Sequence, residues 1–140
     1  MLNLRNEQFK VGIYIRLSRE DGDKQESESI GNQRNIIRRF LQDNELNFVD
    51  EYVDDGVSGT TFDRKGFNRL IQDVEAKRVN MIVTKDLSRL GRDYIKTGYY
   101  LENYFPEKNV RYVAILDGID TYFDTTNNDI TPFKAIMNDM

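Results

Sequence analysis

Short apolar runs rich in β-branched residues alternate along this chain with stretches whose apolar residues recur at helical spacing. The runs, which predict strands, are residues 11–16, 48–53, 81–84 and 111–116. The helical stripes lie within residues 30–44, 67–74 and 94–105. Strands separated in this way by helices predict an α/β fold, with a predominantly parallel β-sheet of at least four strands flanked by helices. A C-terminal helix is expected to begin near Pro132, because proline favours the first helical position.

The amino-acid composition removes several classes of chemistry. Among the 140 residues there is no His and no Cys, which excludes imidazole or thiolate metal ligands, disulfides, and a Ser–His or Cys–His nucleophile. No run approaches the ~18 apolar residues of a membrane span, and the N-terminus lacks the apolar core of a signal peptide. We therefore expect a single soluble, cytoplasmic domain over residues 1–140.

Negative net charge is unusual for a protein that binds nucleic acids, but here the charge is unevenly distributed. The chain has 20 Lys and Arg against 24 Asp and Glu, a net charge of −4. Residues 117–140 contain five Asp and one Lys, so residues 1–116, with 19 acids and 19 bases, carry no net charge. A local cationic site within residues 1–116 is compatible with this distribution.

Ligand sites of parallel α/β sheets lie beyond the carboxyl ends of the strands. The loops to inspect therefore begin at Arg16, Asp54, Lys85 and Asp117. In the first loop, Arg16 and Ser18 point the same way if the strand continues that far, because side chains alternate along a strand. Taken alone, this pair is better explained by a serine that starts a loop and an arginine that pairs with an acid.

The second loop combines polar side chains with glycine. It contains Asp55 and Ser58 and continues to Arg64. Gly56 and Gly59 would let the backbone approach a ligand closely. Asp, Gly and Ser are also the residues of ordinary turns, so this loop by itself does not distinguish a site from a turn.

The third loop carries two arginines three positions apart, Arg89 and Arg92. They share one face if the segment is helical, and two guanidinium groups near a helix start suit phosphate oxygens. A solvated charged turn is the competing interpretation. Gln33 is a smaller anomaly, because it interrupts the apolar stripe of its helix and therefore either caps something or faces a site.

The three loops are expected to meet at one edge of the sheet. There they would bring one exposed serine, Ser18, together with Arg16, Arg64, Arg89 and Arg92. Charge builds on phosphate oxygens during phosphoryl transfer, and preorganised guanidinium groups stabilise it. Neither a GxxxxGK[ST] nor a GxGxxG sequence occurs, which disfavours nucleoside triphosphate and dinucleotide cofactors.

Taken together, these motifs resemble the catalytic domain of the serine recombinases, the resolvase/invertase family. The resemblance covers roughly Lys10 to Leu116 and rests on motifs in the family's order. They are Tyr14-Ile-Arg-Leu-Ser18, Asp55-Gly-Val-Ser-Gly59, Asp63-Arg-Lys-Gly66 and Leu87-Ser-Arg-Leu-Gly-Arg-Asp93.

The resemblance implies a role for each matching residue. Ser18 would be the nucleophile that attacks a DNA phosphate, forming a 5′-phosphoserine and releasing a 3′ hydroxyl. The four arginines would hold that phosphate, and the supporting polar residues would be Gln33, Asp55 and Ser58. It also implies rejoining without ATP, metal or other cofactor. The general base is left open between Asp55 and an arginine.

The family further implies partners and a larger assembly. Double-stranded DNA at a specific crossover site would be the substrate, and the full-length protein would form dimers and a synaptic tetramer. On this basis residues 1–140 are expected to be a fragment, with the remainder of the C-terminal helix and a DNA-binding region missing. The apolar stripe that begins near Pro132 and reaches Met140 fits such a truncated helix.

Two departures from the family's pattern bear on subtype and mechanism. Members commonly carry an acid immediately before the first arginine of the third motif, whereas this chain has Ser88. The loop between Ser18 and Gln33 is longer and more acidic than in small resolvases. Together with Lys85-Asp-Leu-Ser88, this resembles the large serine recombinases of transposons, phages and resistance cassettes.

Two other functions compete with recombination. A receiver-type signalling domain has a similar alternating architecture, but it needs acids after its first strand, where this chain has Arg16 and Ser18. A catalytically inactive DNA-binding or assembly module could also keep this fold. The presence of the serine and all four arginines argues against an inactive module.

Overall fold

A mostly parallel sheet forms the centre of the computed structural model, which describes residues 8–18 and 29–124. Its strands follow the order β2-β1-β3-β4-β5. Their bounds are β1 (Val11–Leu17), β2 (Phe48–Asp55), β3 (Met81–Thr84), β4 (Arg111–Ala114) and β5 (Ile119–Asp120). The pairs β1–β2, β1–β3 and β3–β4 are parallel, whereas β5 runs antiparallel to β4.

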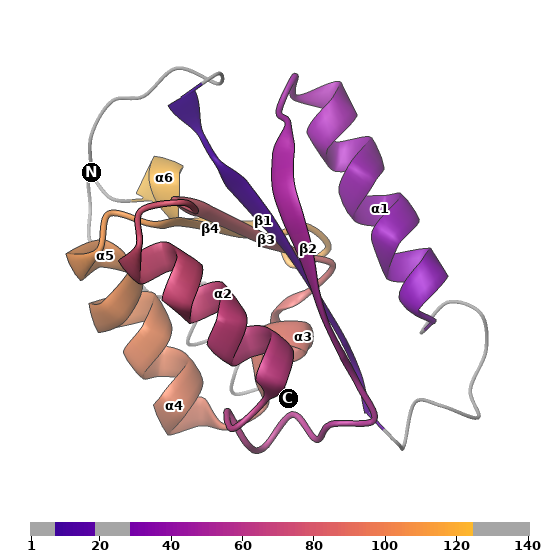
Figure 1. Cartoon of the computed structure of the whole chain (residues 1–140), viewed down its shortest axis with the longest axis vertical. Helices are drawn as coiled ribbons and strands as arrows, with labels where there is room; N and C mark the ends of the chain where they lie inside the picture. The colour runs from indigo at the N-terminus through magenta and orange to yellow at the C-terminus, as the bar shows by residue number, and fades with distance from the viewer. Residues whose placement is uncertain (1–7, 19–28, 125–140) are drawn as a thin grey trace.

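Helices cover both faces of this sheet (Figure 1). Their bounds are α1 (Ile30–Asp43), α2 (Lys65–Glu75), α3 (Leu87–Leu90), α4 (Tyr94–Tyr99), the π-helical turn η4 (Tyr100–Tyr104), α5 (Phe105–Glu107) and α6 (Thr121–Asp124). Figure 1 shows α1 on one side of the sheet, with α2 and α4 on the other. No helix of the described ranges is both long and apolar enough to cross a membrane.

The alternation of side chains along β1 divides the core into two layers. Ile13 and Ile15 belong to the layer that contains Ile37 of α1. Tyr14 points the other way and packs edge-on against Phe67 of α2, with 5.6 Å between ring centroids. Because β1 is covered on both faces and paired along both edges, its residues from Val11 to Arg16 are all buried.

The two long helices begin in different ways. α1 has a local N-cap, because the Ser29 side chain accepts a hydrogen bond from a backbone N–H of the first turn. At the start of α2 the N-cap residue is Arg64, whose side chain makes no capping bond. Asp54 of β2 takes over this task and accepts from the backbone N–H groups of Gly66 and Phe67, at 2.8 and 2.9 Å.

The helix from Tyr94 to Glu107 is interrupted by a π-helical turn, a feature that often occurs near functional sites. Within this turn Tyr100 stacks on Phe62, with 5.0 Å between ring centroids. The Phe62 ring in turn lies 4.4 Å from the centre of the Arg64 guanidinium. The turn is thereby joined through aromatic contacts to the loop that precedes α2.

The predicted fold class is confirmed, with differences at some element ends. β2 extends to Asp55, two residues past the predicted end, because it stays in register with β1 as far as Leu17. The fourth strand stops at Ala114 instead of residue 116. The short β5 was not predicted from the sequence. The helix expected near Pro132 lies outside the described residues.

Candidate active site

Arg16 and Ser18 lie at the carboxyl end of β1, and both are buried, with exposures of 0% and 1%. The expectation of an exposed serine is therefore wrong. Arg16 donates to three backbone carbonyls: Nε to Arg89 O at 3.2 Å, Nη1 to Val57 O at 2.9 Å and Nη2 to Ser88 O at 2.7 Å. This one side chain connects the end of β1 with the second loop and with α3.

The charge of Arg16 is disfavoured by its surroundings. Burial lowers the pKa of its guanidinium to about 10, and repulsion from the nearby positive charges of Arg64, Arg89 and Arg92 contributes in the same direction. The group still carries its charge at neutral pH. The sequence expectation that these four arginines gather in one place therefore agrees with the structure.

Arg64 is held by the loop between β2 and α2 and by the end of α3. Its Nε donates to Thr61 O at 2.6 Å, and its Nη1 donates to Leu90 O at 2.7 Å and to the Tyr14 hydroxyl at 3.2 Å. Nη2 makes a longer contact of 3.4 Å with Gly59 O. With 1% exposure and an aromatic ring beneath it, this guanidinium is fixed in direction.

Arg89 and Gln33 meet at one backbone oxygen. Arg89 Nη1 and Gln33 Nε2 each donate to the Arg16 carbonyl, both at 3.1 Å. Gln33 is fully buried, which explains why a polar residue interrupts the apolar stripe of α1: it faces the end of β1. Gln33 and Arg89 thus hold the backbone between Arg16 and Ser18.

Gly59 is required by close packing among the arginines. A Cβ atom there would lie 2.8 Å from Arg16 Nη2 and 2.9 Å from Arg92 Cγ. Arg92, whose side chain is exposed, also donates its backbone N–H to Gly59 O at 2.8 Å. Glycine is needed at position 56 for a different reason, because the φ of 82° there is one that other residues rarely adopt.

Two of the sequence-predicted residues, Asp55 and Ser58, have exposed side chains at the rim of this cluster. Asp55 is the last residue of β2 and pairs with Leu17. Ser58 shares a hydrogen bond of 2.9 Å with the Thr60 hydroxyl. The structure therefore brings the second loop to the end of β1, but it places these two side chains on its outer surface.

Sequence reasoning missed two buried groups beneath the cluster, Asp54 and Tyr14. Asp54 is 4% exposed and Tyr14 is fully buried, and their side chains are joined by a hydrogen bond of 2.8 Å. The alternation of Tyr52 and Asp54 along β2 was a usable signal, because residues two apart on a strand face the same side. That alternation makes Asp54, rather than Asp55, the inward carboxylate.

A carboxylate does lie beside Arg89, although Ser88 replaces the acid common in the resembled family. Asp86 Oδ1 accepts from the Ser88 hydroxyl at 2.7 Å and lies 3.7 Å from Arg89 Nε. Asp86 also receives the Arg89 backbone N–H at the start of α3, at 3.2 Å. The acid is thus two positions earlier in the chain than expected.

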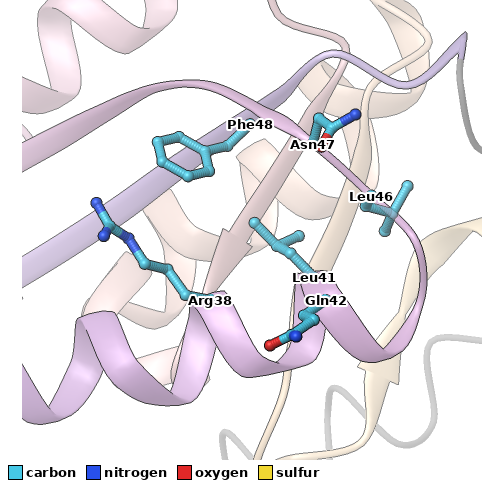
Figure 2. Close-up of a pocket in the computed structure, with 6 residues that line it drawn as sticks. All are labelled: Arg38, Leu41, Gln42, Leu46, Asn47 and Phe48. Carbon is cyan, nitrogen blue, oxygen red and sulfur yellow. The ribbon is translucent and has the colours of Figure 1, made fainter.

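A surface pocket elsewhere in the molecule has different properties. It has a volume of about 240 Å³ and is lined by Arg38, Leu41, Gln42, Leu46, Asn47 and Phe48, at the end of α1 and the start of β2 (Figure 2). Arg38 extends toward the Phe48 ring, 5.1 Å from its centroid. The Arg38 guanidinium also forms a salt bridge with Glu51. The pocket lies at the amino end of β2, opposite the arginine cluster, and contains no nucleophile.

The arginine cluster combines a hydroxyl with concentrated positive charge at the carboxyl ends of parallel strands. Such an arrangement suits an oxyanion with several oxygens, as in a phosphodiester. No group of three or more His, Cys, Asp or Glu side chains in residues 8–18 and 29–124 is arranged to hold a metal ion.

Comparison with known proteins identifies the family. The family model for the resolvase N-terminal domain matches residues 11–140. The N-terminal catalytic domain of TP901-1 integrase is 26% identical, with a TM-score of 0.73 over 91% of this chain and 98% of that one. A resolvase family site-specific recombinase from Streptococcus pneumoniae is 25% identical, with a TM-score of 0.70 over 94% and 88%.

A third solved structure shares the fold at lower similarity. It is the C-terminal catalytic domain of ISC1926 TnpA, an IS607-like serine recombinase, which is 24% identical. Its TM-score is 0.63 over 76% of this chain and 67% of that one. No curated protein sequence matches the chain. The chain belongs to the resolvase family of serine recombinases, whose general activity is site-specific DNA recombination.

Proposed function

We propose that this domain cleaves and rejoins DNA through a covalent bond between Ser18 and a 5′ phosphate. The observation that carries the proposal is the position of Ser18 at the end of β1, two residues after Arg16 and beside the arginine cluster. Family membership supports recombination in general. The serine chemistry and the residue roles are those that the resemblance implies, and this geometry is compatible with them.

In the proposed reaction Ser18 Oγ attacks a DNA phosphorus atom. The Oγ–P bond forms and the P–O3′ bond breaks. The serine proton passes to a base, and the 3′ oxygen takes up a proton from an acid and leaves as a hydroxyl. A 3′ hydroxyl of a second strand then attacks the phosphoserine, and the P–Oγ bond breaks. One phosphoester replaces another in each step, so rejoining needs no ATP, and the arginines would supply the charge stabilisation that a metal ion could otherwise provide.

The arginines would stabilise the transition state of both steps. Arg16, Arg64 and Arg89 are held by backbone carbonyls, so they need little reorganisation when phosphate charge develops. Exposed Arg92 extends from the same cluster and can meet the phosphate from outside. Ser18 is buried in the structure, so we expect this edge of the domain to open when DNA binds.

Two groups are candidates for the proton acceptor. Asp55 lies at the end of β2 beside Leu17, one residue before Ser18. Arg16 is the other candidate, but only through the small deprotonated fraction that a pKa of about 10 allows at neutral pH. Gln33 and Ser58 would serve as supporting polar residues, Gln33 by fixing the Arg16 carbonyl.

We further propose the wider context of the reaction. The substrate would be duplex DNA at the crossover site of a transposon, phage or cassette, bound by dimers that pair into a tetramer. Residues 1–140 would supply the catalytic domain. Their net charge of −4 gives them weak electrostatic attraction to DNA, so site recognition would depend on a separate DNA-binding region.

The central experiment replaces the proposed nucleophile. The natural full-length protein is incubated with a duplex that spans the junction of the element carrying its gene, and covalent complexes are separated under denaturing conditions. Wild type should form an adduct that maps to Ser18. Ser18→Ala should form none while binding the duplex as tightly as wild type.

Two results would refute the proposal. An adduct that persists in Ser18→Ala, or that maps to Ser58 or Ser88, would assign the chemistry elsewhere. A wild-type protein that binds the junction but forms no adduct would favour the catalytically inactive module. Ser88→Ala is the matched control, since this hydroxyl lies near the cluster but donates to Asp86 and should not form the covalent bond.

A further inference from the structure

Asp54 is a buried carboxylate that the proposed reaction does not use directly. It is 4% exposed and accepts three hydrogen bonds. Two come from the first backbone N–H groups of α2, Gly66 at 2.8 Å and Phe67 at 2.9 Å. The third comes from the Tyr14 hydroxyl at 2.8 Å. The carboxylate therefore joins β2, the start of α2 and the middle of β1.

The contact between Asp54 and α2 leaves no space for a side chain. A Cβ atom at Gly66 would lie 2.8 Å from the Val53 carbonyl and 2.9 Å from Asp54 Oδ2. Glycine at this position lets the helix start approach the strand closely. The negative charge is also favourable there, because the N-terminus of a helix carries partial positive charge.

Tyr14 connects this carboxylate to the arginine cluster. Its hydroxyl donates to Asp54 and accepts from Arg64 Nη1 at 3.2 Å. Burial raises the pKa of Tyr14, with Asp54 adding to the rise and Arg64 opposing it, so the hydroxyl keeps its proton. Because the hydroxyl donates its hydrogen bond to Asp54, its oxygen lone pairs remain available to accept one from Arg64.

Arg64 is at once the N-cap residue of α2 and a member of the arginine cluster. Asp54 fixes the position of its backbone through the first turn of α2, and it fixes one end of the guanidinium through Tyr14. Nη2 makes only the 3.4 Å contact with Gly59 O among the described residues, so it is the nitrogen best able to donate a hydrogen bond to a phosphate oxygen.

We propose that Asp54 is a positioning residue that orients Arg64 for phosphate binding, acting through the Tyr14 hydroxyl and the first turn of α2. The proposal rests on the proposed role of Arg64 as a phosphate ligand. It predicts that losing the Tyr14 hydroxyl weakens catalysis only because Arg64 loses its orientation.

Tyr14→Phe tests the link while keeping the ring in place. Tyr52→Phe is a matched control, because Tyr52 is equally buried, lies on the neighbouring strand and donates its hydroxyl to Asp73 of α2 at 2.6 Å. Both variants should lower the urea midpoint to a similar extent. Only Tyr14→Phe should slow DNA cleavage in single turnover, by about tenfold, since a hydrogen bond to a charged group is lost.

A double-mutant cycle tests whether the effect passes through Arg64. In an Arg64→Lys background, Tyr14→Phe should cause little further loss of cleavage rate. An equal loss in both backgrounds would overturn the proposal, and so would an equal slowing by Tyr52→Phe. Asp54→Asn should slow cleavage at least as much as Tyr14→Phe, because the amide cannot accept from both N–H groups and the hydroxyl.

A readout without DNA separates this proposal from the proposed function. The Nε–H signal of Arg64 in ¹⁵N-resolved NMR should be sharp in wild type, because Nε donates to Thr61 O. It should broaden or move in Tyr14→Phe and stay unchanged in Tyr52→Phe. An unchanged signal in Tyr14→Phe would refute the positioning role. A changed signal in a protein that cleaves no DNA would retain it and refute the proposed reaction instead.

Discussion

The arginines of α1 and α2 that lie on the outside, against acids of β2, and those at the carboxyl end of β1 differ in what holds them. On the outside, Arg34 Nε lies 2.7 Å from Glu51 and Arg69 Nη1 lies 2.7 Å from Asp50. At the end of β1, Arg16 and Arg64 are held by backbone carbonyls and one hydroxyl. Within the part of the chain that the structure describes, neither of these two forms a salt bridge.

The difference separates two functions of one side chain. A carboxylate fixes an arginine and also neutralises it, so the pair has little charge left to offer a ligand. A carbonyl fixes the guanidinium through its planar set of donors but leaves a full positive charge. Burial, followed by repulsion from the neighbouring arginines, accordingly lowers the pKa of Arg16. Holding Arg16 and Arg64 with carbonyls therefore leaves their charges available to an anion, whereas Arg89 has a carboxylate, Asp86, 3.7 Å away.

The largest expected effect comes from exchanging one exposed arginine in each region. Arg92→Gln should slow DNA cleavage about a hundredfold, because a transition-state donor of this kind contributes roughly 3 kcal/mol. Arg69→Gln should change the rate by less than about twofold, since its charge is already paired with Asp50. Both side chains are exposed, so neither substitution should prevent folding.

Single-turnover cleavage of the junction duplex measures both rates. Equal losses in the two variants would mean that arginines act by non-specific attraction to DNA. The difference between carboxylate-paired and carbonyl-held arginines would then have no effect on function. A rate loss in Arg92→Gln that disappears at saturating protein would point to binding rather than chemistry.

A simple anion should stabilise the cluster, at an intermediate magnitude. At a concentration 100-fold above its Kd, sulfate would add about 2.7 kcal/mol to the free energy of unfolding, which raises Tm by several degrees. The gain should shrink in Arg92→Gln. Chloride at the same ionic strength is the control. Sulfate also stabilises proteins in general, and the rise in Tm that remains in Arg92→Gln measures that general effect.

The pH dependence of this gain follows from Arg16. Its folded pKa of about 10 lies below the ordinary 12.5, so its charge destabilises the free protein fully below pH 10. This destabilisation disappears as the pH rises from about 10 to 12.5. Arg16 also loses the positive charge that attracts sulfate as the pH approaches its pKa. The sulfate-induced rise in Tm should therefore decrease between pH 8 and pH 10.5. A gain that stays constant over this range would show that Arg16 does not contribute to the anion site.

The smallest effect is expected for the outer ion pairs. Burial pushes the pKa of Glu51 up, but the hydrogen bonds from Arg34 and Arg38 outweigh it and leave the pKa below its ordinary 4.5. Glu51→Gln should lower the free energy of unfolding by about 1 kcal/mol or less. The difference from wild type should vanish in 1 M salt and as the pH falls below 4.5, where the paired carboxylate becomes protonated.

Urea unfolding at low and high salt measures this contribution. A loss that persists in 1 M salt would indicate that Glu51 stabilises the fold by packing rather than by charge. Such a result would also weaken the contrast between paired and carbonyl-held arginines.

Elements with strong local patterns could be predicted from the sequence. The stripe of Phe67, Leu70 and Val74 defines α2, and Met81–Thr84 coincides with β3. The gathering of the four arginines followed from the rule that parallel strands place their ends at one edge. These features depend on hydrophobic periodicity and strand direction, which are written into short stretches of sequence.

Features that depend on tertiary contacts could not be predicted in this way. β2 ends at Asp55 because its pairing with β1 continues, and this made Asp54 the inward acid. The π-helical turn at Tyr100 has no local signature; it is accompanied by aromatic stacking on Phe62. The burial of Ser18 likewise depends on neighbours distant in the sequence. The roles of the eight predicted site residues remain predictions.

The parallel pairing of β1 with strands that come later in the chain has a consequence for biosynthesis. Arg16 contacts Val57 and Arg89, which are 41 and 73 positions further along. Contacts of such separation form slowly and late in folding. A nascent or partly folded chain thus possesses the serine but lacks its electrostatic surroundings. On the proposed function, the chain could not cleave DNA until its synthesis had passed residue 92 and the sheet had formed.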